Sequence, residues 1–135
     1  MHVLPFSGKT FVTMVGQSPI DISTRHLGSV TIVDVNGDIT LRSTPELRKL
    51  LLEVLREKNT ARVLVNLSRV RYIDSAGIAS LVEALRVSRD TNRGFGLFGL
   101  TKATLQVLEL TRLTKVFDIY ASEDDAVRGT SSPPG

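Results

Sequence analysis

Stretches of β-branched and apolar residues recur along the middle of the chain and predict four strands. Val30–Val35 is followed by the turn-forming pair Asn36-Gly37, and Asp38–Leu41 is expected to extend the same strand. Arg62–Leu67 is more uniformly apolar, which is typical of a buried parallel strand. The other two predicted strands are Phe95–Leu100 and Val116–Tyr120.

Between these strands, apolar residues recur at helical spacing behind residues suited to capping. Ser43 and Glu46 fit a capping box, and Pro45 suits a first helical turn, so a helix is predicted from this point to Asn59. Three more helices are predicted. One follows Asp74 and stops at Asn92-Arg93-Gly94, the next spans Lys102–Leu110 after the cap Thr101, and the last begins at Ser122.

The alternation of strands and helices predicts one α/β domain, with parallel strands joined by right-handed helical crossovers. The domain is expected to cover residues 20–128. Residues 1–19 are expected to form a flexible or extra N-terminal extension, in which Met14 is a second candidate start and Phe11–Val15 a candidate extra strand. Residues 129–135 are expected to be a disordered tail. The predicted core includes Leu51, Val65, Leu67, Leu81 and Leu85.

Composition removes several kinds of chemistry. The 135 residues include no cysteine, which excludes a disulfide, a thiol nucleophile and a cysteine-based metal centre. The histidines, His2 and His26, precede the α/β body, so no hydrolase triad, metal site or cofactor is expected. The net charge is only +3 and the arginines are scattered, which argues against direct nucleic-acid binding. No apolar run reaches the ~18 residues of a membrane span and no export signal is evident, so a cytoplasmic protein is expected.

Residues 94–99 match the GxGxxG spacing of dinucleotide-binding loops. Such a loop holds a pyrophosphate only where it follows a strand and opens a helix. Here the motif follows a helix and a polar turn, and its large hydrophobic residues predict a strand. Asp118 lies about twenty residues on, at the offset of a ribose-binding acid, so a nucleotide-binding enzyme stays an alternative. The favoured interpretation is a glycine-rich strand packed against a close helix.

A different kind of site is predicted at residues 74–77, between a buried strand and a helix. Asp74 and Ser75 are both favoured helix caps, so a structural role is one interpretation. One cap suffices, however, and Gly77 costs ~1 kcal/mol of helix propensity relative to Ala. The small Ala76 and Gly77 leave the Ser75 hydroxyl approachable, and a phosphate there would meet the positive end of the helix dipole. With no general base evident, a phosphorylated charge switch is expected rather than a nucleophile.

The same stretch, together with others, resembles the STAS domain of bacterial anti-sigma factor antagonists. The resemblance covers about Ile20–Val127 and rests on residues 33, 37–39, 47–48, 65–67, 72–78, 108–111, 113, 116–117 and 119–120. It implies a mixed, mostly parallel sheet with helices mainly on one face, and a monomer or weak dimer. It also implies a cycle in which the unphosphorylated protein binds an anti-sigma factor, a serine kinase of the histidine-kinase-like ATPase type, and the sigma factor is released. The kinase then phosphorylates Ser75, and a metal-dependent serine phosphatase resets the protein.

Two positions depart from the family pattern. Thr40 stands where family members usually carry an acid near the phosphoacceptor. Arg112 stands where they usually carry Gly, so a positive φ at this position would strain it by ~1 kcal/mol.

The partner surface is predicted at the carboxyl ends of two neighbouring strands, because binding sites of α/β sheets collect there. Ile78 is expected to be its exposed apolar contact or the rim of one. A STAS accessory subunit that is never phosphorylated, on a lipid-transport ATPase or a signalling assembly, is the alternative function. The predicted partner-binding residues are Asp38, Thr40, Thr44, Asp74, Ser75, Ala76, Gly77 and Ile78.

Overall fold

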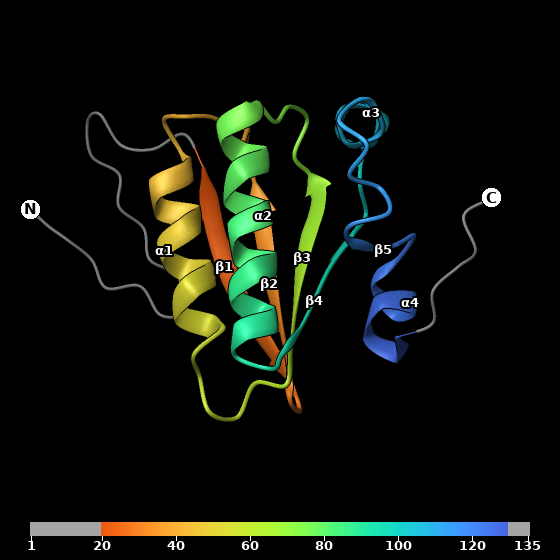
Figure 1. The fold of residues 1–135 in the computed structure, drawn as a ribbon. Coiled ribbons are helices and arrows are strands. Elements are labelled where there is room, and N and C mark those ends of the chain that lie inside the picture. Colours follow the sequence, from red (N-terminus) through yellow and green to blue (C-terminus); the bar gives the residue numbers. More distant parts are fainter. Residues whose placement is uncertain (1–19, 130–135) are drawn as a thin grey trace, which may run out of the picture.

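Strands and helices alternate along residues 20–129, the part of the chain that the computed structural model describes (Figure 1). The predicted strand over Phe11–Val15 and the predicted tail beyond Gly129 lie outside these residues. The elements are β1 (Asp21–Leu27), β2 (Val30–Asn36), α1 (Thr44–Val54), β3 (Arg62–Arg69), α2 (Ser75–Asp90), β4 (Gly94–Phe98), α3 (Lys102–Leu110), β5 (Asp118–Tyr120) and α4 (Glu123–Arg128).

The strands form one sheet in the order β1-β2-β3-β4-β5. β1 pairs antiparallel with β2, whereas β2, β3, β4 and β5 are parallel neighbours connected through α1, α2 and α3. Gly28, with φ of 63°, makes the tight turn between the first two strands, a conformation that glycine adopts without strain. The predicted α/β class with a mixed, mostly parallel sheet is therefore confirmed.

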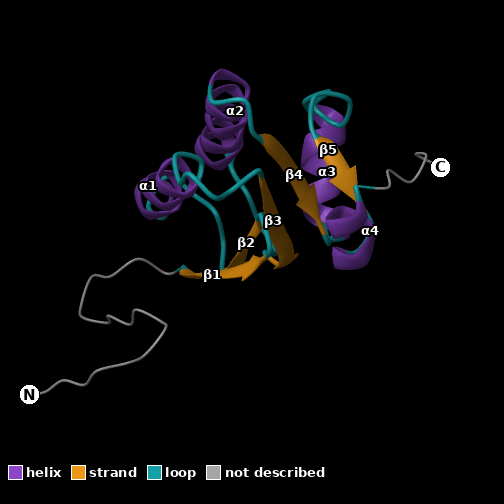
Figure 2. Cartoon of the chain, turned by 90° about the horizontal axis from the view of Figure 1, so that it is seen from below, coloured by secondary structure: helices purple, strands orange, loops and turns teal. Residues whose placement is uncertain are grey.

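Each face of the sheet has its own hydrophobic cluster, because successive strand residues point to opposite sides. α1 and α2 lie together on one face (Figure 2), over a large cluster that also includes Leu108 of α3. On the other face, Ala126 of α4 packs with a smaller cluster around Ile32, Leu64, Phe98 and Tyr120. All five predicted core residues are buried in the large cluster: Leu51, Val65, Leu67, Leu81 and Leu85.

Several element boundaries differ from their predictions. β2 ends at Asn36, and Asp38–Leu41 does not extend it; only Ile39 forms a bridge, with Ile73. α1 ends at Val54 rather than at Asn59, and β5 begins at Asp118 rather than at Val116.

The predicted capping box at α1 is wrong. The Ser43 side chain makes no cap hydrogen bond to α1. Its hydroxyl instead donates to the Asp38 carbonyl at 2.8 Å and accepts from the Thr40 amide at 2.9 Å. Ser43 is fully buried, and it holds together the connection between β2 and α1. Within residues 20–129, no helix is both long and apolar enough to cross a membrane.

Candidate functional site

Two connections lie against each other at the edge of the sheet where β2 and β3 end. One leads from β2 to α1 and the other from β3 to α2, so the amino-terminal ends of both helices lie at this edge (Figure 1). The Ile39 amide donates to the Tyr72 carbonyl, and the Asp74 amide donates to the Ile39 carbonyl, both at 3.0 Å. The sequence prediction that these two turns are neighbours is therefore confirmed.

Asp74 ties the two connections together through its side chain. As the N-cap of α2, its Oδ1 accepts from the Gly77 amide at 2.9 Å, which satisfies a backbone donor that the helix leaves unpaired. Its Oδ2 accepts from the Leu41 amide, in the other connection, at 3.0 Å. Asp74 is therefore a structural clamp, with each carboxylate oxygen bound to a backbone N–H.

Ser75 is the first residue of α2, and it is exposed. Its hydroxyl has no hydrogen-bond partner among residues 20–129. Because Asp74 caps the amino terminus of α2, the Ser75 hydroxyl is not needed for capping. An exposed hydroxyl beside the positive end of a helix dipole is free to be modified, and the dipole favours a negative group there.

Gly77 serves a close contact inside the protein. A Cβ at this position would lie 2.7 Å from the Ile39 carbonyl oxygen, 2.7 Å from Ile39 Cγ2 and 2.6 Å from Ile73 Cγ1. Gly77 itself is buried, so its small size allows α2 to approach the other connection. Access to Ser75 was the role expected for this glycine, and the close contact with Ile39 and Ile73 gives it a second role in packing.

Ile78 is buried, with 8% of its surface exposed, so the expectation of an exposed apolar contact is wrong. The helical turn points Ile78 into the large cluster. Among the other predicted contact residues, Thr44 is also buried, Thr40 and Ala76 are half-buried, and Asp38 is exposed. The predicted partner-binding roles of the accessible residues stay predictions.

Two exposed hydrophobic residues at this edge were not predicted from the sequence. Leu41 is 72% exposed and Tyr72 is 54% exposed. Their signal in the sequence is weak, since each stands beside an arginine and outside any helical repeat. Only the arrangement of the two connections brings them to one edge.

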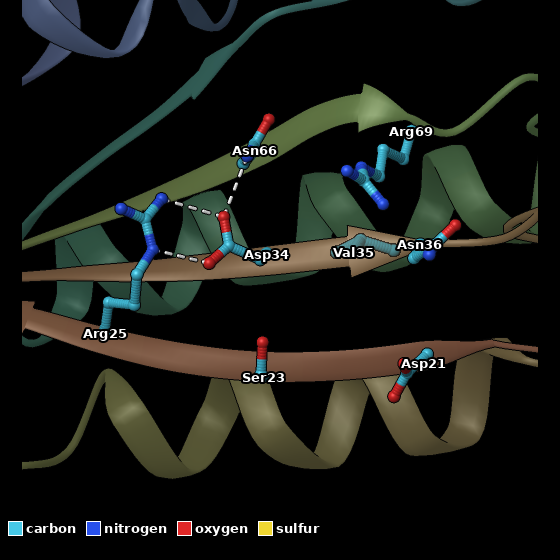
Figure 3. Close-up of a pocket in the computed structure, with 8 residues that line it drawn as sticks. All are labelled: Asp21, Ser23, Arg25, Asp34, Val35, Asn36, Asn66 and Arg69. Atoms are coloured by element: carbon cyan, nitrogen blue, oxygen red, sulfur yellow. Dashed lines mark hydrogen bonds and ion pairs between the residues drawn. The ribbon is translucent and has the colours of Figure 1, made fainter. Parts of the chain in front are cut away.

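A hollow lies on the face of the sheet opposite α1 and α2. It is a polar groove of about 330 Å³, and Figure 3 shows side chains of β1, β2 and β3 along it. The lining residues are Asp21, Ser23, Arg25, Asp34, Val35, Asn36, Asn66 and Arg69. No cluster of three or more His, Cys, Asp or Glu residues that could hold a metal ion occurs within residues 20–129.

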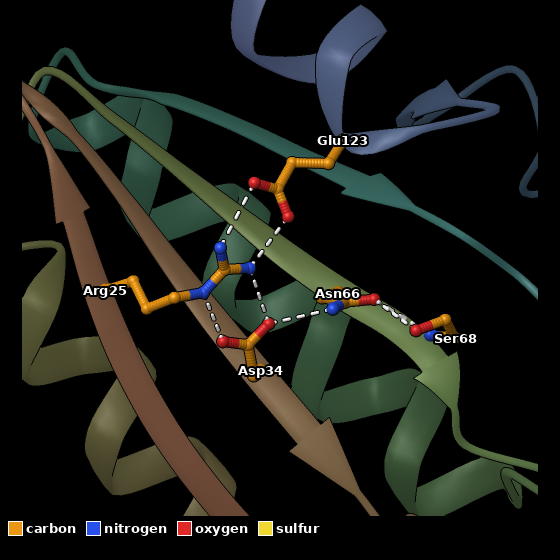
Figure 4. A network of polar contacts seen from close by, with 5 residues as sticks. All are labelled: Arg25, Asp34, Asn66, Ser68 and Glu123. Carbon is orange, nitrogen blue, oxygen red and sulfur yellow. Dashed lines mark hydrogen bonds and ion pairs between the residues drawn. The ribbon is translucent and has the colours of Figure 1, made fainter.

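The charges at one end of this groove are paired with one another (Figure 4). Arg25 binds Asp34 through two nitrogens, at 2.6 and 2.9 Å, and also binds Glu123 of α4, at 2.8 and 3.1 Å. Burial alone would raise the pKa of Asp34, but hydrogen bonds from Arg25 and Asn66 outweigh this and hold the pKa below its ordinary value. The network is therefore a means of fastening α4 to the sheet.

The GxGxxG segment forms β4, as its large hydrophobic residues predicted. The predicted packing of this strand against a helix is confirmed, because Phe95 and Leu97 share the large cluster with α2; the closest neighbours of Gly96 itself, however, include residues of a strand. A Cβ on Gly96 would lie 3.0 Å from the Tyr120 ring and 3.2 Å from the Asp118 carbonyl oxygen, both in β5. Packing against β5 explains Gly96 without a bound phosphate.

This chain is similar to known proteins over most of its described residues. The STAS domain family model matches residues 21–126. The anti-sigma-B factor antagonist of Listeria monocytogenes is 29% identical over 106 residues, which cover 78% of this chain and 91% of that protein.

Among solved structures, an anti-sigma factor antagonist from Mycobacterium paratuberculosis superposes with a TM-score of 0.75 at 24% identity, covering 87% of this chain and 97% of that one. The phosphorylated form of the Bacillus cell fate determinant SpoIIAA gives a TM-score of 0.63 at 13% identity, covering 80% and 97%. These likenesses show a shared fold. Since the family model covers every strand and nearly all of the helical residues described above, the chain belongs to the STAS domain family.

Proposed function

We propose that this protein is an anti-sigma factor antagonist of the bacterial cytoplasm. In its unphosphorylated form it binds an anti-sigma factor, and the sigma factor held by that anti-sigma factor is released. The observation that carries the proposal is the exposed, unpaired hydroxyl of Ser75 at the first residue of α2. Membership of the STAS family and the name of the Listeria relative support it.

The proposed partner is a serine kinase of the histidine-kinase-like ATPase type, which ends the interaction by phosphorylating Ser75. A serine phosphatase reverses the modification. A solved structure of SpoIIAA is described as a phosphorylated form of that protein, and this supports the proposal.

Electrostatics explains how a phosphate would act at this edge. Asp38 and Asp74 are balanced by Arg42 and Arg71, the arginines of the two connections. A phosphoserine adds a charge of about −1.5 to −2, so the edge would become clearly negative. A partner surface that fits a neutral hydroxyl, and that also holds nucleotide phosphates, would be repelled by this charge.

Thr40 modifies the expected pairing with the kinase. It is half-buried, and its hydroxyl accepts from the Arg42 amide at 3.3 Å. The family's usual acid is absent at this position, so the unphosphorylated edge is less negative than in relatives that carry it. Thr40→Asp restores the family's acid and should strengthen kinase engagement through a contact at residue 40 itself, because added negative charge at this edge would by its overall effect oppose binding.

The test is calorimetric affinity for the anti-sigma factor kinase of the same organism, across Ser75→Ala, Ser75→Glu and Thr40→Asp. Ser75→Ala should bind like the wild type, and Ser75→Glu should bind at least tenfold more weakly. Ser29→Glu is the matched control, because Ser29 is exposed at the opposite edge, where β2 and β3 begin. Equal affinities of Ser75→Ala and Ser75→Glu would refute the charge switch and favour a STAS subunit that is never phosphorylated.

A further inference from the structure

The edge that carries Ser75 also presents an unusual apolar pair. Leu41 and Tyr72 are 72% and 54% exposed, although large hydrophobic side chains are usually covered. The other exposed large hydrophobic residues among residues 20–129 lie elsewhere, on β1, at the end of α3 and before β5: Leu27, Leu110 and Val116.

The backbone under this pair is fixed by hydrogen bonds. The Leu41 amide is bound to the Asp74 carboxylate, and the Tyr72 carbonyl accepts from the Ile39 amide, each at 3.0 Å. Asp74 directly precedes Ser75 in the chain. The pair is therefore held ready beside the proposed phosphorylation site, and little ordering of the backbone would oppose binding.

Each member of the pair is followed or preceded by an arginine. Arg42 and Arg71 are exposed, and neither guanidinium has a hydrogen-bond or ion-pair partner within residues 20–129. By contrast, Arg48 is bound to Glu83, and Arg62 is bound to the carbonyls that end α4. Tyrosine and arginine are enriched in the residues that dominate protein–protein binding energy.

We propose that Leu41 and Tyr72 are the apolar anchors that dock on the protein partner recognising Ser75. That partner presents an apolar pocket rimmed by carboxylates, which complement Arg42 and Arg71. The inference rests on the proposed function, and it names the chemistry of the partner surface. It also replaces the buried Ile78 with two accessible residues as the hydrophobic contact.

The experiment measures binding of the purified anti-sigma factor kinase that binds the wild-type chain. Leu41→Ser and Tyr72→Ala should each raise the dissociation constant at least tenfold. Leu110→Ser is the matched control, because Leu110 is 77% exposed on α3, and it should stay within twofold of the wild type. The thermal unfolding midpoint of each variant is compared with that of the wild type, to check that the variant is folded.

Charge reversal tests the carboxylate rim. Arg42→Glu should slow association at least fivefold, with an effect that shrinks as salt is added, whereas Arg56→Glu at the far end of α1 should not.

The possible outcomes separate the two proposals. If Ser75→Glu weakens binding while Leu41→Ser and Tyr72→Ala bind like the wild type, the proposed function stands and the anchors are refuted. If the wild type binds no such kinase of its own organism, the proposed function fails and the anchors fail with it. If sedimentation shows a wild-type dimer that Leu41→Ser dissociates, the pair belongs to a self-association surface, which overturns the inference.

Discussion

Gly77→Ala is the most informative single change at the candidate site, because two known effects oppose each other there. Alanine in place of glycine inside a helix is worth ~1 kcal/mol of stability. The new Cβ, however, would approach three atoms at 2.6 to 2.7 Å, and one of them is the Ile39 carbonyl oxygen. A backbone oxygen cannot rotate out of the way, so α2 and the connection after β2 would have to separate.

The expected change in the free energy of unfolding is the cost of overpacking minus the gain in helix propensity. Overpacking of a tight interior costs ~1–3 kcal/mol, and the upper part of this range applies where backbone must move. Subtracting the ~1 kcal/mol of helix propensity leaves a net loss of about 2 kcal/mol in the free energy of unfolding. Separation of the two connections would also lengthen the hydrogen bond between the Leu41 amide and Asp74.

Urea unfolding followed by circular dichroism measures this difference. Ala79→Gly, at an exposed position of the same helix, is the matched control, and it should lose ~1 kcal/mol through helix propensity alone. If Gly77→Ala were as stable as the wild type, or more stable, while Ala79→Gly lost its expected amount, the close approach of the two segments would be refuted.

Three further changes test other parts of the molecule. Leu81→Ala should lose ~2–5 kcal/mol in urea unfolding, because Leu81 is fully buried and its removal leaves a cavity; a loss below ~0.5 kcal/mol would contradict its place in the core. Arg112→Gly should raise the free energy of unfolding by ~0.5–1 kcal/mol, since Arg112 has φ of 62°. The increase should be larger than that of Asn92→Gly, because asparagine tolerates this conformation better, and equal increases would argue against strain at Arg112. The lowered pKa of Asp34 means that its charge stabilises the folded state above the ordinary aspartate pKa of ~3.9 and that this contribution is lost as pH falls through the folded-state pKa. The stability difference between wild type and Asp34→Asn should therefore shrink on acidification below about pH 4, and a constant difference would show that the Asp34 charge contributes nothing.

Periodic elements and the closeness of the two connections could be predicted from the sequence, whereas individual side-chain contacts between segments distant in sequence could not. The third helix was placed correctly over Lys102–Leu110, because its cap Thr101 and its apolar spacing agree. β1 was missed, since as an edge strand it leaves most of Asp21–Leu27 exposed and shows no clear alternation of apolar and polar residues. Ser43 is the N-cap residue of α1, as predicted, but the hydrogen bond of a capping box is absent because its hydroxyl binds the Asp38 carbonyl and the Thr40 amide within its own connection.

The candidate site shows the same limit. The motif at residues 74–77 placed Asp74 and Ser75 correctly between a strand and a helix. Ile78 stands at helical spacing from Leu81 and Leu85, and the face that these residues share packs against the core rather than a partner. The exposure of Leu41 depends on where the other connection lies, which no local pattern reports.

The order of the strands in the sheet has a consequence for how the chain folds. Each strand after β1 lies beside the strand made just before it, so every pairing closes a short segment and the contact order is low for a parallel sheet. A chain leaving the ribosome from its amino terminus can therefore add strands one at a time to a growing sheet. The ion pair between Arg25 and Glu123 joins residues 98 positions apart, so it closes only after all five strands and the start of α4 have been made.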